Sequence, residues 1–203
     1  MDHGPWTLPN LLTLGRLAAL PFLIVAILEG RHGTALLIFL AAAISDIVDG
    51  FLARRFGMGS RLGAYLDPIA DKLFLVSSFV VFALPATPSR LHIPSWLLAL
   101  TISRDICILA MCGVGFFAFG IRSFPPSGLG KATTFLEIST VVALLLMNVG
   151  RMPEIVARVC FQLVAAFAGA SGLHYVWRAS RSLSIRARGG LGDPHGPGST
   201  AAP

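Results

Sequence analysis

Four aspartates lie close together in an otherwise apolar part of the chain, and as a group they could bind metal ions. Asp46 and Asp49 lie near the end of one apolar run, and Asp67 and Asp71 lie near the start of the next. Carboxylate oxygens without Cys or His ligands are the donors that Mg²⁺ and Mn²⁺ prefer. The residue types therefore predict a site for one or two divalent cations.

The spacing places these aspartates on two helix faces. Positions 46 and 49 are three apart and positions 67 and 71 are four apart, and residues at such spacings share a face of a helix. The connection between the two runs is short, which predicts antiparallel neighbours. Asp46 lies eight residues before Arg54, and Asp71 lies eight residues after Gly63. At ~1.5 Å per residue both lie about 12 Å from the helix ends, so we expect the four carboxylates to converge.

Four acids within membrane segments need a counter-charge. Insertion scales give about 2.5–3.5 kcal/mol for each Asp at the centre of a spanning helix. Of the basic residues nearby, we expect only Arg54 and Lys72 to serve the aspartates, so divalent cations should supply most of the positive charge. The alternative, in which the aspartates are helix caps and ion-pair partners, suits a lone aspartate better than four at matched depth.

The composition predicts that membrane helices position the aspartates. Hydrophobic residues make up 55% and charged residues 13% of the 203 residues, and the mean hydropathy is +0.76. This charged share is about half that of a soluble domain. The net charge of +6 could indicate nucleic acid, but the basic residues stand singly between apolar runs. That pattern favours a membrane protein with no nucleic-acid partner.

A spanning helix needs roughly 20 mostly apolar residues, and six segments come close to that length. They are residues 10–29, 34–53, 64–85, 94–118, 132–149 and 154–177. We therefore predict an all-α, polytopic membrane protein with six transmembrane helices. Residues 1–188 form one membrane domain, and the tail of residues 189–203, rich in Gly and Pro, is expected to be disordered.

The basic residues predict the orientation of the spans. With six spans both termini lie on one side, which carries nine basic residues, against four on the other side. The nine are Arg54, Arg55, Arg61, Arg122, Lys131, Arg178, Arg181, Arg186 and Arg188, and the four are Arg31, Arg90, Arg151 and Arg158. Cytoplasmic loops are enriched in Lys and Arg, so we expect both termini and the aspartate end of the bundle to face the cytoplasm.

Small and basic residues beside the first aspartate pair could serve a ligand. Gly50 and Ala53 share the aspartate face and leave space for a ligand, or they allow the close helix packing common in membranes. Arg54 at the mouth suits a phosphate through bidentate contact. Arg16 interrupts the first apolar run. Either that run begins as a short interfacial piece, or Arg16 snorkels to the membrane surface.

The residues from Asp46 to Asp71 follow the pattern D-x2-D-G-x2-A-R-x8-G-x3-D-x3-D. At every fixed position this resembles the signature of the CDP-alcohol phosphatidyltransferase family. The similarity extends over residues 8–178, and includes the segment from Leu8 to Arg16, the triplet Ser103-Arg104-Asp105 and the pair Gly130-Lys131.

The resemblance implies a fold and a reaction. The expected fold is six transmembrane helices, usually in a homodimer, in the inner membrane of a bacterium. Membrane lipids surround the helices, and a polar cavity opens to the cytoplasm. The expected reaction transfers a phosphatidyl group from CDP-diacylglycerol to an alcohol and releases CMP. By resemblance Asp46, Asp49, Asp67 and Asp71 bind two Mg²⁺ or Mn²⁺ ions, Asp71 is also the general base, and Gly50, Ala53 and Arg54 hold the CDP moiety.

The acceptor alcohol depends on residues outside the signature. The layout is most similar to that of phosphatidylglycerophosphate synthases, whose acceptor is glycerol 3-phosphate. A phosphorylated acceptor needs further cations, and Arg104 and Lys131 are the candidates. Alternatively, Arg104 pairs with Asp105 and Lys131 is an ordinary cytoplasmic flank. The Ser-Arg-Asp triplet is also similar to that of CMP-forming cardiolipin synthases, which use phosphatidylglycerol as acceptor. Synthesis of phosphatidylinositol phosphate or phosphatidylserine is a less favoured alternative.

A divalent-cation transporter is the alternative from a different functional class. It would use the same acidic cluster but needs polar ligands that continue toward the far side of the membrane. The later spans offer only Asp105 and Glu137, so the path is predicted to be closed. A purely structural membrane protein is the least favoured alternative, because it has no use for four buried acids.

Overall fold

The computed structural model describes residues 8–56, 61–119 and 128–189, with side chains over residues 12–46, 48, 69–110 and 128–173. This part of the chain consists of six α-helices and contains no strand. The helices are α1 (Leu8–Leu28), α2 (His32–Phe56), α3 (Arg61–Ala83), α4 (Ser95–Phe119), α5 (Gly128–Asn148) and α6 (Glu154–Gly189). The predicted all-α class is confirmed, and each of the six apolar segments corresponds to one helix.

The last helix extends beyond its predicted apolar segment. The apolar segment ends near residue 177, whereas α6 continues to Gly189. The added residues include Ala and Arg, which are good helix formers in any polar surrounding. The predicted disordered tail covers residues 189–203, of which Gly189 ends α6 and residues 190–203 lie outside the described residues.

Two tight turns depend on glycine. Gly30 after α1 has a φ of 71° and Gly150 after α5 has a φ of 79°, a region that favours glycine because it lacks a Cβ. A Cβ on Gly30 would lie 3.1 Å from Pro88 Cγ. The α1–α2 turn therefore packs closely against the loop between α3 and α4. His32 Nε2 lies 2.7 Å from the Pro88 carbonyl oxygen and strengthens the same contact.

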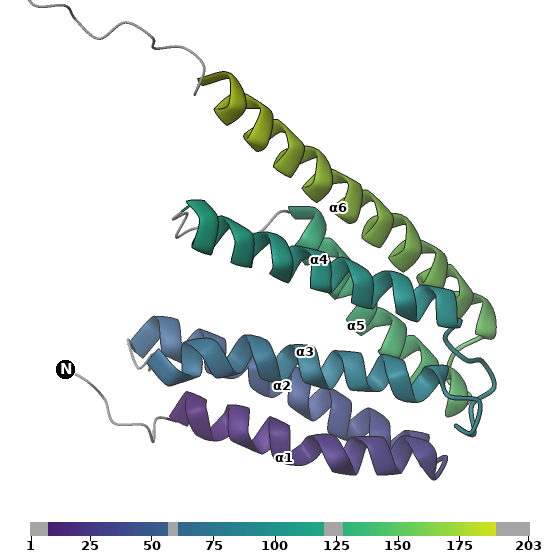
Figure 1. Ribbon diagram of the computed structural model, residues 1–203. Helices are drawn as coiled ribbons and strands as arrows, with labels where there is room; N and C mark the ends of the chain where they lie inside the picture. The colour runs from purple at the N-terminus through teal and green to yellow at the C-terminus, as the bar shows by residue number, and fades with distance from the viewer. Residues whose placement is uncertain (1–7, 57–60, 120–127, 190–203) are drawn as a thin grey trace, which may run out of the picture.

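The six helices form two groups, α1–α3 and α4–α6, which meet mainly where α2 packs against α5. Successive helices run in opposite directions, so the end of α2 and the start of α3 lie at the same end of the bundle (Figure 1). Helix α1 packs against α2 and α3, and α6 packs against α4 and α5. Helix α2 also contacts α5, and α3 contacts α4 and α5. The rings of Phe39 and Phe74, 5.7 Å apart, join α2 to α3.

Apolar side chains fill the core and also cover much of the surface. Leu23, Phe82, Leu97 and Leu144 are fully buried, while large hydrophobic residues on every helix are exposed. The exposed ones include Phe22, Leu37, Ile69, Leu109, Phe135 and Leu173. Apolar surface of this extent suits a lipid environment. Within the described residues, Gly128–Asn148 and Glu154–Leu173 are long and apolar enough to cross a membrane, and α1 and α2 contain the shorter apolar stretches Leu12–Leu28 and His32–Asp46.

Candidate active site

The four predicted metal ligands lie on the two helices that the sequence indicates. Asp46 and Asp49 belong to α2, and Asp67 and Asp71 belong to α3. All four are in the halves of these helices nearest the α2–α3 connection. The structure describes the side chains of Asp46 and Asp71. Those of Asp49 and Asp67, like the predicted CDP-binding residues Gly50, Ala53 and Arg54, lie outside the described side chains.

Arg16 of α1 brings Asp46 and Asp71 together. Its Nη2 lies 3.2 Å from Oδ1 of Asp46, and its Nη1 donates a hydrogen bond to Oδ1 of Asp71. The Arg16 side chain is only 3% exposed, whereas the two aspartate side chains are 45% and 43% exposed. The guanidinium therefore reaches the carboxylates from the buried side, and their outer side is accessible to a ligand.

The prediction that only Arg54 and Lys72 could serve as nearby cations is wrong, because Arg16 contributes from α1. The pairing joins residues 55 positions apart in the sequence, and it arises because α1 packs against both α2 and α3. Arg16 is buried in an ion pair, so it does not snorkel to a membrane surface. In the sequence, the sign of this role is a single arginine within an apolar run. The partners of Arg16 become apparent only from the packing of α1.

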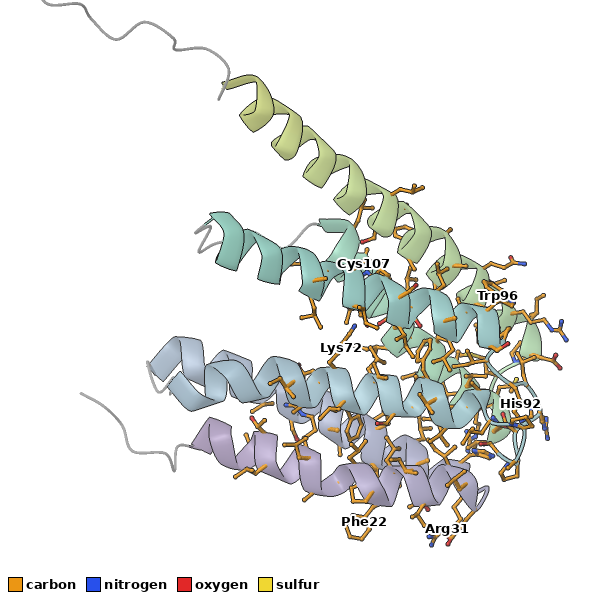
Figure 2. All side chains as sticks on the ribbon, in the orientation of Figure 1. Phe22, Arg31, Lys72, His92, Trp96 and Cys107 are labelled. Carbon is orange, nitrogen blue, oxygen red and sulfur yellow. The ribbon has the colours of Figure 1, made fainter. Side chains whose placement is uncertain are left out.

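Lys72 also differs from the expectation, because it extends away from Asp71. Consecutive residues of a helix point about 100° apart, so Lys72 lies on a different face of α3. It projects from α3 toward α4 (Figure 2), where its Nζ lies 2.5 Å from Oδ2 of Asp105 and 3.8 Å from Oε2 of Glu137. Lys72 therefore neutralises a second acidic group.

Lys72, Arg104, Asp105 and Glu137 form a charged cluster between α3, α4 and α5, which we call the interhelix cluster. Nη1 of Arg104 donates to Oδ1 of Asp105 at 2.8 Å. Two cations thus face two carboxylates, which balances the formal charge. The side chains of Arg104 and Glu137 are 6% and 4% exposed. Through Lys72, the interhelix cluster joins the two groups of helices by ion pairs.

Arg104 also connects α4 to α5 and α6. Its Nη2 lies 3.4 Å from the carbonyl oxygen of Gly130 and 3.4 Å from Oγ of Ser171. Arg104 also pairs with Asp105, which is one of the two roles considered for it. Lys131, the other candidate for the acceptor phosphate, follows Gly130 and is exposed. The structure thus brings Arg104 and Lys131 to adjacent positions, with one buried and the other open to solvent.

The donor set of the aspartate site fits a hard divalent cation. Asp46 and Asp71 present carboxylate oxygens from two helices to one positive group, and both remain accessible. Oxygen donors of this kind suit Mg²⁺ and Mn²⁺. Asp49 and Asp67 are about one helical turn away on the same two helices. Among the described side chains, which include only two of the four aspartates, no three His, Cys, Asp or Glu residues form a metal-binding group.

Comparison with known proteins identifies the family of this chain. The sequence profile described as CDP-alcohol phosphatidyltransferase matches residues 6–171. The chain belongs to this family. The matched region contains all four aspartates and Arg16, together with the interhelix cluster. The family resemblance predicted from the aspartate spacing is confirmed.

Relatives within the family have two kinds of name. A Streptomyces coelicolor protein named cardiolipin synthase (CMP-forming) is 35% identical, over 71% of this chain and 66% of the relative. An Arabidopsis thaliana protein named CDP-diacylglycerol--glycerol-3-phosphate 3-phosphatidyltransferase 1 is 36% identical, over 68% of this chain and 50% of the relative. A Mycobacterium tuberculosis protein named probable phosphatidylglycerophosphate synthase is 29% identical, over 87% and 83%. The chain thus spans less than two thirds of the first two relatives.

Proposed function

We propose that the chain is a membrane enzyme that transfers a phosphatidyl group from CDP-diacylglycerol to an alcohol. The observation that carries this proposal is the family's aspartate signature, with Asp46 and Asp71 meeting at an accessible site. In the reaction, the acceptor hydroxyl oxygen forms a bond to the phosphorus that bears the diacylglycerol. The bond from that phosphorus to the CMP oxygen breaks, and CMP leaves.

The aspartates divide the chemical work between metal binding and proton transfer. Asp46, Asp49, Asp67 and Asp71 hold two Mg²⁺ or Mn²⁺ ions, which when bound neutralise the diphosphate charge. Asp71 also accepts the proton of the acceptor hydroxyl, because it is positioned beside the reacting group. Gly50 and Ala53 leave space for the CDP moiety, and Arg54 pairs with its phosphate.

The membrane arrangement is part of the proposal. All six helices cross the inner membrane of a bacterium, both termini face the cytoplasm, and the enzyme is a homodimer. The exposed apolar side chains on every helix and the two long apolar helices support insertion. The excess of Lys and Arg at the aspartate end supports a cytoplasmic active site. CDP-diacylglycerol then enters from the surrounding lipid, and the acceptor enters from the cytoplasm.

Glycerol 3-phosphate is the acceptor that we propose. Lys131 is exposed at the start of α5 and offers an ammonium group to the acceptor phosphate. The names of the Arabidopsis and Mycobacterium relatives support this choice. Arg104 can bind the same phosphate only if its surroundings rearrange, since its side chain is 6% exposed and both Nη atoms already have partners. The product is phosphatidylglycerophosphate.

CMP-forming cardiolipin synthesis is the second candidate. The name of the Streptomyces relative supports it, and its acceptor, phosphatidylglycerol, needs fewer free cations than glycerol 3-phosphate. To decide, purified protein with CDP-diacylglycerol and Mn²⁺ is offered glycerol 3-phosphate, phosphatidylglycerol, inositol phosphate or serine, and the lipid product is identified by mass spectrometry. We expect phosphatidylglycerophosphate. Formation of cardiolipin would mean that the acceptor is phosphatidylglycerol. The absence of a lipid product with every acceptor would overturn the proposed transferase.

Lys131→Ala is expected to raise the KM for glycerol 3-phosphate about tenfold, because a charge-assisted hydrogen bond to the phosphate is lost. The KM for CDP-diacylglycerol should change less than about twofold, since the donor binds at the aspartates. Steady-state kinetics with each substrate varied in turn measures both values. Arg151→Ala, which removes an exposed cation just beyond the other end of α5, should change neither. An equal rise in both KM values would exclude the acceptor role of Lys131.

A further inference from the structure

Arg16 places a permanent positive charge inside the aspartate site. A guanidinium keeps its proton at any physiological pH. Arg16 contacts the Oδ1 atoms of Asp46 and Asp71, and its side chain is 3% exposed. Solvent therefore screens this charge much less than it would at the surface. Any cation that binds the same carboxylates must do so in the presence of Arg16.

We infer that Arg16 is a resident counter-ion that stabilises the metal-free site and competes with the divalent metal for the aspartates. This inference rests on the proposed metal site. Without metal, carboxylates on α2 and α3 would repel each other, and Arg16 neutralises and joins them from α1. With metal bound, two positive groups share the same carboxylates. Arg16 thus raises the stability of the metal-free protein and lowers its metal affinity.

Two features of the geometry support competition in addition to a structural role. Both contacts are to carboxylates of the metal-ligand signature, so the guanidinium and a metal ion would share the same carboxylate groups. The buried side of the site is closed by Arg16, while the outer side of each carboxylate is open. A metal ion entering from the open side therefore meets a like charge across the carboxylates, and like charges at such short range repel strongly in a partly buried site.

Arg16→Gln tests the inference, because it removes the charge and keeps a polar side chain. Mn²⁺ binding is measured by the electron paramagnetic resonance signal of free Mn²⁺, and thermal unfolding is followed in EDTA and in saturating Mn²⁺. We expect Mn²⁺ to bind about tenfold more tightly than to the wild type because the repulsion is lost. We also expect a lower unfolding temperature in EDTA and a larger increase on adding Mn²⁺, since a ligand stabilises the state that binds it.

Two control variants separate charge from general damage. Arg16→Lys keeps the charge but cannot reach two carboxylates with separate nitrogens. It should bind Mn²⁺ within about twofold of the wild type, since the repulsion persists, and show intermediate stability in EDTA. Arg158→Gln removes an exposed arginine that pairs with Glu154 on α6, and should change neither Mn²⁺ binding nor metal-dependent stability.

The outcomes that would overturn the inference are distinct from a failure of the metal site. If Arg16→Gln binds Mn²⁺ no more tightly than the wild type, Arg16 does not compete with the metal. Tighter binding by Arg16→Lys to the same degree as by Arg16→Gln would also exclude a charge effect. If the wild type itself binds no Mn²⁺, both the proposed metal site and the role of Arg16 are wrong.

Discussion

Asp71→Asn is expected to lower the rate of CMP formation at least about 1,000-fold, because it removes both a metal ligand and the proton acceptor. General-base catalysis alone contributes about 10²–10⁴-fold. Asp67→Asn should be comparably inactive through the loss of a metal ligand. The rate is measured as CMP released from saturating CDP-diacylglycerol with Mn²⁺ and glycerol 3-phosphate. Both variants should still insert into the membrane and dimerise.

A matched control separates the reaction from a general effect of losing a carboxylate. Glu154→Gln changes a half-exposed carboxylate on α6 that pairs with Arg158, and it should keep wild-type activity. Because Arg16 contacts Asp71, the Asp71 variant also needs a comparison of its unfolding temperature with that of the wild type. Full activity in the Asp67 or the Asp71 variant would exclude the assignment of the aspartates as metal ligands.

Arg104→Met is expected to lower the free energy of unfolding by about 3 kcal/mol, because it removes one partner of a buried ion pair. Methionine keeps much of the side-chain volume, so the lost charge and hydrogen bonds dominate the effect. The variant loses the contacts of Arg104 with Asp105, Gly130 and Ser171. Asp105 keeps Lys72 as a partner, so we expect the loss of stability to be at the lower end of the range for broken buried ion pairs. Denaturant unfolding in detergent micelles measures this change.

The same variant separates the two roles considered for Arg104. Arg158→Met is the matched control, since this exposed pair on α6 should contribute no more than about 0.5 kcal/mol. If Arg104→Met is as stable as the wild type but raises the KM for glycerol 3-phosphate, Arg104 serves the acceptor and not the fold. Loss of stability with an unchanged KM in the folded fraction would establish the structural role.

The sequence predicted the helices well, because each is a long apolar run bounded by Gly, Pro or charged residues. The six segments correspond to the six helices, and only the end of α6 differs clearly. That difference arises because hydropathy indicates where a helix can lie in lipid, whereas Ala and Arg residues continue the helix beyond it. The spacing of the aspartates also identified the family, which the profile match over residues 6–171 confirms.

The partners of the charged residues were predicted less well. Proximity in sequence pointed to Lys72 as a counter-ion for the aspartates, but its direction on α3 takes it to Asp105. Arg16 is remote in sequence and reaches Asp46 and Asp71 only because α1 packs on both of their helices. Such pairings depend on how helices rotate and pack against one another. A single sequence without its tertiary contacts does not specify them.

Metal-dependent release of CMP from CDP-diacylglycerol tests the proposed transferase most directly. Purified protein in mixed micelles is given CDP-diacylglycerol and glycerol 3-phosphate, first with EDTA and then with excess Mn²⁺. We predict no CMP in EDTA and rapid release once Mn²⁺ is added, with one phosphatidyl product formed for each CMP. If folded protein that binds Mn²⁺ releases no CMP with any acceptor, and instead carries Mn²⁺ into sealed vesicles, the aspartate site belongs to a transporter and the proposed enzyme is wrong.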